Sequence, residues 1–415
     1  MSDYPVLLTN GRLILADRVV SNGWLLLTEG KIGALGSGDP PETCILDVPA
    51  DKMQHIDLHG AWAAPGFIEL HSHGAGGSDF MDGTVQAWET IAATHAAHGT
   101  TTILATTLAS APAALDRTLQ TWFDWQDAGL DRPDAPDRHT ATIWGLHLEG
   151  PYFSPEQAGA QDPRYLRNPD PNEYRRLISS TPGIRRWSAA PELPGALMFG
   201  EYAAGHGILV SMAHTNALYE EVLAAVRHGY TLVTHLYSGM STVRRIDGLR
   251  HGGVIESALL LDDLAVEVIA DGRHLPPELL QLIFRCKGRS RIALVTDSMR
   301  AAGQDVRESL LGGLDDGQPV IIRDGVARLP DGSALAGSVA TGDRLLRIMH
   351  LTAGISLVDT VAMLTETPAR LLGLQENKGA LAAGMDGDLA ILDQNFQVTR
   401  TFIGGRQVFG NIRYD

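Results

Sequence analysis

The chain has 415 residues, of which 44% are hydrophobic and 20% are charged, a composition typical of a globular protein and not of a disordered or fibrous one. Its 33 Lys and Arg residues against 49 Asp and Glu residues give a formal net charge of −16, which argues against a nucleic acid or an anionic membrane as partner. The length allows one large domain and a smaller one.

Cysteine usage and the start of the chain favour a cytoplasmic protein. The two cysteines, Cys44 and Cys286, form neither a disulfide framework nor a Cys-x-x-Cys pair, which fits a reducing compartment. The first residues lack the basic and apolar regions of a signal peptide. No apolar run approaches the roughly 18–20 residues of a membrane span. We therefore expect a soluble, cytoplasmic protein.

Short apolar runs separated by turn dipeptides fill the first part of the chain. Asn10-Gly11 lies between two such runs and predicts a hairpin turn, and Glu29-Gly30 follows another run. The same pattern of short apolar runs and turn residues is found again near the C-terminus. Two β-rich ends around a different middle predict a small β-sandwich domain built from residues 1–63 and 373–415.

The middle of the chain alternates short apolar strands with helical stretches. The strands are expected at residues 67–70, 101–104, 142–148, 185–190, 208–213, 231–234, 266–270 and 292–296. Helical periodicity is found at 85–98, 218–229 and 276–285. Eight such repeats predict an α/β fold, a (β/α)8 TIM-like barrel over residues 64–372. A doubly wound sheet would also alternate, but no Gly-x-Gly-x-x-Gly follows the first strand.

Residues that can bind a metal or move a proton follow most of these strands. In chain order they are His71, His73, Glu149, His214, His235, His274 and Asp297. A (β/α)8 barrel carries its functional groups at the C-terminal ends of the strands. The recurrence therefore predicts one site at the barrel mouth.

Five of these residues are candidate metal ligands. His71 and His73 alternate along one strand and can face the same ion, although two exposed loop histidines are the plainer reading. Glu149 can bridge two cations, a role for which no lysine stands at a strand end. His214 and His235 lie 21 residues apart, which is one β/α unit; the alternative is two unrelated core histidines. This ligand set suits zinc and also admits iron, manganese or cobalt.

The remaining two residues are candidates for the chemistry itself. Asp297 can take a proton from an activated water and later deliver it to a leaving nitrogen. His274 can polarise a carbonyl oxygen, or it is an exposed loop histidine. His147 lies two residues before Glu149, one step deeper on the same face, and we expect it to be buried and hydrogen-bonded and not to be a ligand.

The order of these groups resembles the amidohydrolase superfamily. Within it, the segments that carry the resemblance are 147–151, 213–217, 235–237, 270–274, 296–297, 335–338 and 379–384. They look like the N-acetylglucosamine-6-phosphate deacetylase family, and the similarity spans nearly the whole chain.

The resemblance implies hydrolysis of the acetamide of N-acetylglucosamine 6-phosphate to glucosamine 6-phosphate and acetate, in amino-sugar catabolism. It implies a barrel with a β-sandwich from both termini, usually as a homodimer. The implied metal ligands are His71, His73, Glu149, His214 and His235. Asp297 would be the general acid and base, and His274 would contact the carbonyl. Because both His71 and His73 are present, one or two divalent ions are expected, with zinc first.

The family resemblance also marks candidate substrate-binding residues. Arg250 stands 24 residues before His274, where the family has an arginine that reaches the substrate phosphate of the neighbouring subunit; guanidinium geometry suits phosphate, but a solvated surface charge is the alternative. Gln161 replaces a substrate-binding histidine of the family. Ser238-Gly239 replaces Asn-Ala. These departures affect the sugar and phosphate side and leave the metal ligands intact.

Other functions stay open at this point. The nearest is an amidohydrolase for another N-acetyl hexosamine or its phosphate, an N-acyl amino acid, or a deaminase substrate, since one fold supports many pockets. A more distant alternative is a non-catalytic barrel scaffold, which a metal assay would reveal. The expected partner is a small amino-sugar molecule.

Overall fold

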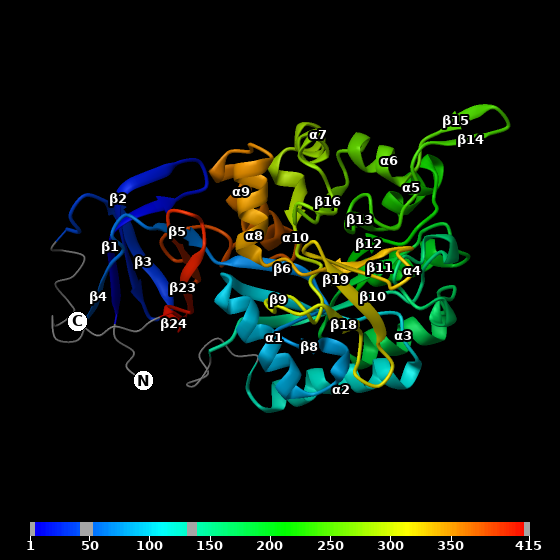
Figure 1. Cartoon of the computed structure of the whole chain (residues 1–415), viewed down its shortest axis with the longest axis horizontal. Helices are drawn as coiled ribbons and strands as arrows, with labels where there is room; N and C mark the ends of the chain where they lie inside the picture. Colours follow the sequence, from blue (N-terminus) through cyan, green and yellow to red (C-terminus); the bar gives the residue numbers. More distant parts are fainter. Residues whose placement is uncertain (1–4, 42–52, 131–138, 411–415) are drawn as a thin grey trace.

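The computed structural model describes residues 5–41, 53–130 and 139–410. Cys44 and the first four residues, on which two of the expectations above rest, lie outside these ranges. Two eight-stranded sheets dominate the described part of the chain. Strands from both chain ends form one sheet, and the middle of the chain forms the other (Figure 1).

The central sheet is the predicted (β/α)8 barrel. Its strands pair in parallel in the order β17-β16-β13-β12-β11-β10-β9-β6. In chain order they are β6 (Phe67–Ser72), β9 (Thr100–Thr106), β10 (Thr142–Glu149), β11 (Ile184–Ala189), β12 (Leu209–Met212), β13 (Tyr230–Val233), β16 (Ala265–Val268) and β17 (Ile292–Leu294). All eight predicted strands are confirmed. Every residue of β6 and of β9 is buried, as expected for parallel strands covered on both sides.

The barrel closes where its first and last strands meet. Ser72, at the end of β6, forms a parallel bridge with Ser298, beyond β17. The Asp297 N–H donates to the His71 carbonyl oxygen at 2.9 Å. The buried Glu69 carboxylate accepts from the N–H groups of His71 and Thr296, both at 3.0 Å. These contacts bring the first and last candidate site residues together.

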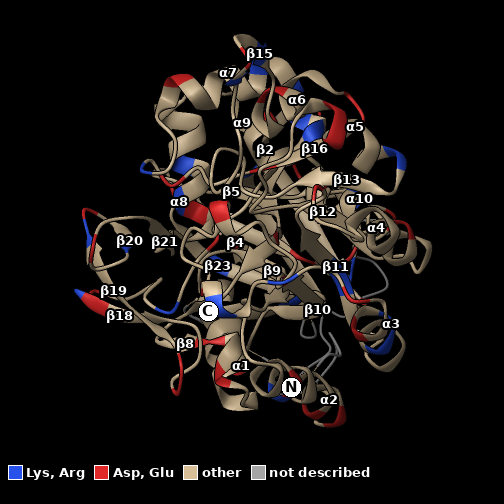
Figure 2. Cartoon of the chain, turned by 90° about the vertical axis from the view of Figure 1, so that its right-hand side faces the viewer, with Lys and Arg blue, Asp and Glu red and all other residues tan. Residues whose placement is uncertain are grey.

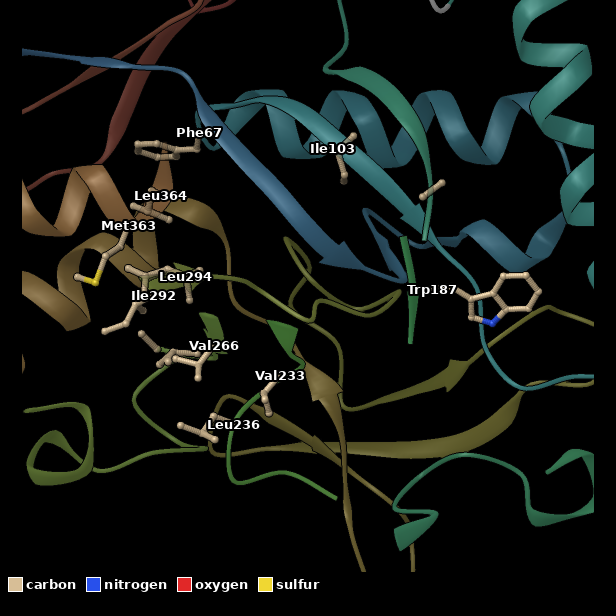
Figure 3. Packing of buried hydrophobic residues seen from close by; sticks show 14 of the residues in the cluster. Phe67, Ile103, Trp187, Val233, Leu236, Val266, Ile292, Leu294, Met363 and Leu364 are labelled. Atoms are coloured by element: carbon tan, nitrogen blue, oxygen red, sulfur yellow. The ribbon is translucent and has the colours of Figure 1, made fainter. Parts of the chain in front are cut away.

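Helices surround the barrel and pack against its strands to form the core. They are α1 (Val85–Ala97), α2 (Pro112–Asp127), α3 (Pro171–Ser180), α4 (Ala196–Gly205), α5 (Tyr219–Arg227), α6 (Val254–Leu260), α7 (Pro277–Lys287), α8 (Gly342–Arg347), α9 (Leu357–Leu364) and α10 (Glu366–Leu371). The three predicted helices correspond to α1, α5 and α7. Large side chains such as Trp187, Val266 and Met363 fill the space between strands and helices (Figure 3). The continuous core leaves the strand ends as the place for polar groups.

The terminal sheet joins the two ends of the chain, as predicted. Its strands are β1 (Val6–Ile14), β2 (Val19–Thr28), β3 (Lys31–Ser37), β4 (Gln54–Asp57), β5 (Trp62–Pro65), β22 (Leu389–Leu392), β23 (Val398–Ile403) and β24 (Arg406–Phe409). The link is the antiparallel pairing of β5 with β22. The domain boundaries at 63/64 and 372/373 stay predictions.

The hairpin predicted at Asn10-Gly11 is wrong. Strand β1 continues through both residues, and its pairing with β2 shifts register on either side of Gly11. Asn10 adopts a left-handed backbone, with φ of 54°, which accommodates a bulge as readily as a turn. The turn at Glu29-Gly30, between β2 and β3, is confirmed, with φ of 51° and 77°.

Three β elements outside the two large sheets were not predicted, the smallest being the pairing of β7 (Gly74–Ala75) with β8 (Ser78–Asp79). A four-stranded sheet follows β17, formed by β18 (Glu308–Leu311), β19 (Gln318–Arg323), β20 (Val326–Arg328) and β21 (Leu335–Ser338). A hairpin of β14 (Arg244–Ile246) and β15 (Leu249–His251) extends away from the barrel (Figure 1). Within the described ranges, no helix is both long and apolar enough to cross a membrane.

Candidate metal centre

The candidate site residues lie at the C-terminal ends of the barrel strands. Glu149 is the last residue of β10, and His71 lies near the end of β6. His214 and His235 follow β12 and β13, and Asp297 follows β17. These last three have left-handed backbones, with φ of 45°, 27° and 46°. Such conformations are costly for non-glycine residues and are typical of functional sites.

The structure brings six of the predicted residues into two adjoining groups. His71, His73 and Asp297 form one group, and Glu149, His214 and His235 form the other. Within each group the candidate ligand atoms all lie within 4.8 Å of one another, and all six residues are buried. Asp297, predicted only as acid and base, therefore also belongs to a potential ligand set.

The Glu149 carboxylate lies between the two groups. Its Oε1 is 3.0 Å from Nε2 of His235 and 3.5 Å from Nε2 of His214. The same oxygen is 3.4 Å from Nε2 of His71, and Oε2 is 3.3 Å from Nε2 of His73. Oδ1 of Asp297 is 3.4 Å from Nε2 of both His71 and His73. One carboxylate thus contacts all four imidazoles, which is the geometry that a bridging ligand needs.

Strong electrostatic coupling accompanies this crowding. Burial alone would lower the pKa of His71, but the charges of Glu149 and Asp297 outweigh it and raise the pKa to about 9. Burial is likewise outweighed at His73, where hydrogen bonds to Asp297 and Glu149 raise the pKa to about 10. Burial raises but the histidines lower the pKa of Asp297, to about 2, and that of Glu149 falls well below its usual range. Both carboxylates are therefore ionised, and they favour positive charge on the neighbouring imidazoles or on a bound cation.

These residues fit a divalent metal. The Nε2 atoms of His71 and His73 approach each other to 3.4 Å, with two carboxylates around them. The buried Nδ1 atoms of His73 and His235 have no hydrogen-bond partner in the described part of the chain, whereas their Nε2 atoms face the Glu149 carboxylate. Imidazole nitrogen and carboxylate oxygen are ligands that zinc, iron, manganese and cobalt accept.

His274 is held by a carboxylate that the sequence reading did not assign. Its Nδ1 lies 2.9 Å from Oδ2 of Asp271, and its backbone N–H donates to Oδ1 of the same residue at 2.8 Å. Burial raises the pKa of Asp271, but the His274 side chain outweighs it and holds that pKa below its usual range. Asp271 thus orients the imidazole. The spacing of three positions between Asp271 and His274 is the feature of the sequence from which this contact could have been predicted.

Three of the candidate substrate-binding positions lie against the candidate metal ligands. Gln161 is buried, and its Nε2 donates to Oε2 of Glu149 at 2.7 Å while its Oε1 accepts from the Ala109 N–H at 2.9 Å. Gly239 has φ of 57°, and a Cβ there would lie 2.8 Å from Nδ1 of His214. The adjoining Ser238 donates its N–H to the His235 carbonyl oxygen. Glycine at 239 therefore leaves room for the imidazole.

Arg250 lies apart from this cluster. It is exposed on β15, opposite Arg245 of β14, and Figure 2 shows basic residues at this end of the molecule. Arg244 is different: its guanidinium donates to the carbonyl oxygen of Asn216, two residues beyond His214. The base of the hairpin thus contacts the barrel mouth, whereas Arg250 faces outward.

Beneath the candidate ligands lies a buried polar layer. His147, as expected, is buried and hydrogen-bonded, with Nε2 2.7 Å from Oγ of Ser188. Arg186 and Glu267 form an ion pair in the same layer. The sequence predicted no role for either residue, because β11 and β16 are separated by several β/α units. The one feature of the sequence that could have pointed to the pair is a charged residue within each of two apolar strands.

Comparison with known proteins places the chain in a family. The amidohydrolase family model matches residues 62–408. The chain is 31% identical over 400 residues to an N-acetylglucosamine-6-phosphate deacetylase of Bacillus subtilis (strain 168), with 96% of this chain and 95% of that protein covered. It is also 31% identical to an N-acetylgalactosamine-6-phosphate deacetylase of Escherichia coli O157:H7, with 95% and 97% covered.

Solved structures agree with this placement. An N-acetyl-D-glucosamine-6-phosphate deacetylase mutant from Mycobacterium smegmatis, in complex with N-acetyl-D-glucosamine-6-phosphate, superposes with a TM-score of 0.85 at 30% identity, covering 98% of this chain and 99% of that one. The Pasteurella multocida N-acetylglucosamine-6-phosphate deacetylase gives 0.86 at 27% identity, covering 98% and 100%. The chain therefore belongs to the amidohydrolase family of metal-dependent hydrolases, in the branch that contains the N-acetylglucosamine-6-phosphate deacetylases.

Proposed function

We propose that the protein hydrolyses the acetamide of N-acetylglucosamine 6-phosphate, releasing acetate and glucosamine 6-phosphate. The observation that carries the proposal is the convergence of two buried ligand groups on the Glu149 carboxylate. Relatives named for this activity match the chain over nearly its whole length. The site's chemistry and the family thus support the same reaction.

In this proposal His71, His73, Glu149, His214 and His235 hold one or two divalent ions, with zinc the first choice. Such an ion would polarise the amide carbonyl and lower the pKa of an attacking water. The arrangement of donors, with Glu149 between two groups, supports a two-ion site.

Asp297 and His274 carry the proton and carbonyl contacts. Asp297 is a buried carboxylate with a pKa of about 2, because nearby histidines outweigh burial; it is therefore ionised, the form that can take a proton from the attacking water. It then donates that proton to the leaving nitrogen. His274, oriented by Asp271, donates to the carbonyl oxygen from Nε2 when both ring nitrogens are protonated.

The substrate side involves residues around this centre. We assign Gln161, Ser238 and Gly239 to the sugar, since the first contacts Glu149 and the last packs against His214. The relative that acts on N-acetylgalactosamine 6-phosphate is as similar in identity as the B. subtilis enzyme. The galactosamine epimer is therefore the second candidate substrate.

Arg250 is proposed to bind the phosphate of a substrate held by a second copy of the chain. The hairpin that carries it stands away from the barrel, and its side chains from residue 245 to residue 251 are exposed. Ile246 and Leu249 are exposed apolar residues on the same hairpin, which suits burial in a subunit contact. We accordingly propose a homodimer, working in the cytoplasm.

The test is kcat/KM on N-acetylglucosamine 6-phosphate, N-acetylglucosamine and N-acetylgalactosamine 6-phosphate, with zinc or ferrous ion supplied. We expect the first substrate to exceed the unphosphorylated sugar by about 100-fold or more, which is roughly 2.7 kcal/mol. A larger value for the galactosamine epimer would transfer the assignment to it. Slow turnover of all three would contradict the proposal and leave only the amidohydrolase family.

A further inference from the structure

Arg186 on β11 and Glu267 on β16 form an ion pair inside the barrel. Both side chains are completely buried. Both terminal nitrogens of Arg186 contact the Glu267 carboxylate, with Nη2 2.9 Å from Oε2. The guanidinium also donates to the Leu70 carbonyl oxygen at 3.1 Å and to hydroxyls of Ser211 and Thr234. One arginine thereby connects β11 to three other strands and to the residue after β13.

Such a pair is not explained by stability alone. Removing two charges from water costs several kcal/mol per ion, and well-packed apolar side chains of similar size often stabilise a core equally well. The pair therefore calls for a role beyond filling the barrel.

Glu267 reaches one candidate ligand from each metal group. Its Oε2 lies 3.4 Å from Nδ1 of His71 and 3.3 Å from the backbone nitrogen of His235, which donates to it. A proton on Nδ1 of His71, donated to Glu267, leaves the Nε2 lone pair directed at His73, Glu149 and Asp297. The carboxylate thus selects the tautomer that can bind a metal.

The other three imidazoles of the cluster lack this support. Nδ1 of His214 lies 2.8 Å from the Gln157 carbonyl oxygen. Nδ1 of His73 and of His235 has no partner among the residues that the structure describes. Of the four, His71 alone has a carboxylate at Nδ1 there, and only Arg186 neutralises that carboxylate with a fixed positive charge.

We propose that Arg186 and Glu267 are positioning residues that hold His71 in the orientation and tautomer required for metal binding. The inference rests on the proposed function in one respect, the assignment of His71 as a metal ligand. Arg186 fixes the carboxylate, and the carboxylate fixes the imidazole. Neither residue needs to touch the substrate.

The experiment measures metal binding without substrate, by titrating chelator-stripped protein with Zn²⁺ against a competing dye and with Co²⁺ by visible absorption. His71→Ala first identifies the binding step to which His71 contributes. The double variant Arg186→Met/Glu267→Leu removes both charges together, so that no unpaired ion is buried. We expect that step to weaken about 10- to 100-fold in the double variant, with an altered Co²⁺ spectrum.

Two further variants separate positioning from general destabilisation. Arg186→Met/Glu267→Gln keeps an oxygen near His71, and we expect it to recover most of the lost affinity. Lys378→Met/Asp388→Asn removes a buried ion pair of the terminal region, and we expect metal binding to remain as in the wild type. If Arg186→Met/Glu267→Leu does not fold, Glu267→Asp with Arg186 retained is the alternative. It shortens the side chain that carries the carboxylate and should weaken the metal-binding step that depends on His71.

Unchanged affinity for the His71 step in folded variants would overturn the proposal. So would the absence of any metal-binding step that His71→Ala removes, or a loss in the Lys378/Asp388 control equal to that in the barrel. Failure of the deacetylase assignment would be recognised separately, as metal binding with the expected variant pattern but without turnover of the phosphorylated sugar.

Discussion

Two clusters of charged side chains in the molecule balance their charge in opposite ways. In the terminal ion cluster, Lys31 and Lys378 face Asp386 and Asp388, with separations from 2.5 to 3.0 Å. Each carboxylate there has a permanently charged partner. At the barrel mouth the ion-pair partners of Glu149 and Asp297 among the described residues are imidazoles, which are cationic only when protonated. The charges of the terminal cluster are balanced by its own side chains, whereas those at the barrel mouth are balanced when the imidazoles are protonated or a metal ion is bound.

A buried carboxylate indicates a functional site when its partners are imidazoles, whose charge depends on protonation, and not lysines, whose charge is permanent. The terminal cluster connects β3 to the segment before β22 and stabilises the sheet. The mouth places the carboxylates of Glu149 and Asp297 against the same imidazole of His71, and Asp297 lies on left-handed backbone. Both features cost stability and are retained where a site needs them. Substitutions should therefore affect stability in one region and chemistry in the other.

The largest effect is expected at the mouth. Asp297→Asn keeps the shape of the side chain but cannot accept a proton, so kcat should fall about 100- to 10,000-fold. At least one ion per chain should be retained, because Glu149, His214 and His235 form their own group. Turnover and metal analysis on the same preparation would check this. Retained turnover would remove Asp297 from the mechanism.

The terminal cluster should respond in the opposite way. Lys378→Met leaves the buried Asp388 without its ammonium partner, so the free energy of unfolding should fall by about 3 kcal/mol. Metal content and kcat per folded molecule should not change. Chemical denaturation with a metal assay would test both expectations. A loss of metal with unchanged stability would break the contrast between the regions.

Much of this contrast follows from the sequence. Each barrel strand is a local apolar run, and each candidate ligand stands just beyond one, so fold and donor set could be predicted together. The ion pair of Arg186 and Glu267 could not be predicted from the sequence, because the two residues are 81 positions apart and neither stands at the end of a strand. The Asn10-Gly11 turn failed because the same left-handed residue serves a bulge or a hairpin, and only cross-strand pairing decides between them.

A smaller effect is expected at the hairpin of β14 and β15. Arg250→Ala should lower kcat/KM for the phosphorylated sugar about 10- to 100-fold, the range of a hydrogen bond to a charged group. It should leave the unphosphorylated sugar unaffected. Arg245→Ala, the cross-strand neighbour in the same hairpin, is the matched control. Equal losses for both sugars would indicate a structural role for the hairpin and not phosphate recognition.

The smallest effect concerns pH. Burial raises the pKa of Asp386, but Lys31 and Lys378 outweigh it and hold that pKa below its usual value. A lowered folded-state pKa stabilises the protein above the unfolded value of about 3.9 and ceases to do so as pH falls below it. The stability difference between wild type and Asp386→Asn should therefore be at most about 1 kcal/mol at pH 6 and shrink toward pH 3. A difference that grows on acidification would contradict this sign.

The most direct test of the account is the activity of chelator-stripped protein on N-acetylglucosamine 6-phosphate before and after stoichiometric Zn²⁺, for the wild type and for His214→Ala. The account predicts that stripping abolishes turnover, that zinc restores it in the wild type, and that His214→Ala stays inactive at the same zinc concentration. Full turnover by the stripped protein, or equal restoration of both proteins, would contradict a metal-dependent site built on these residues.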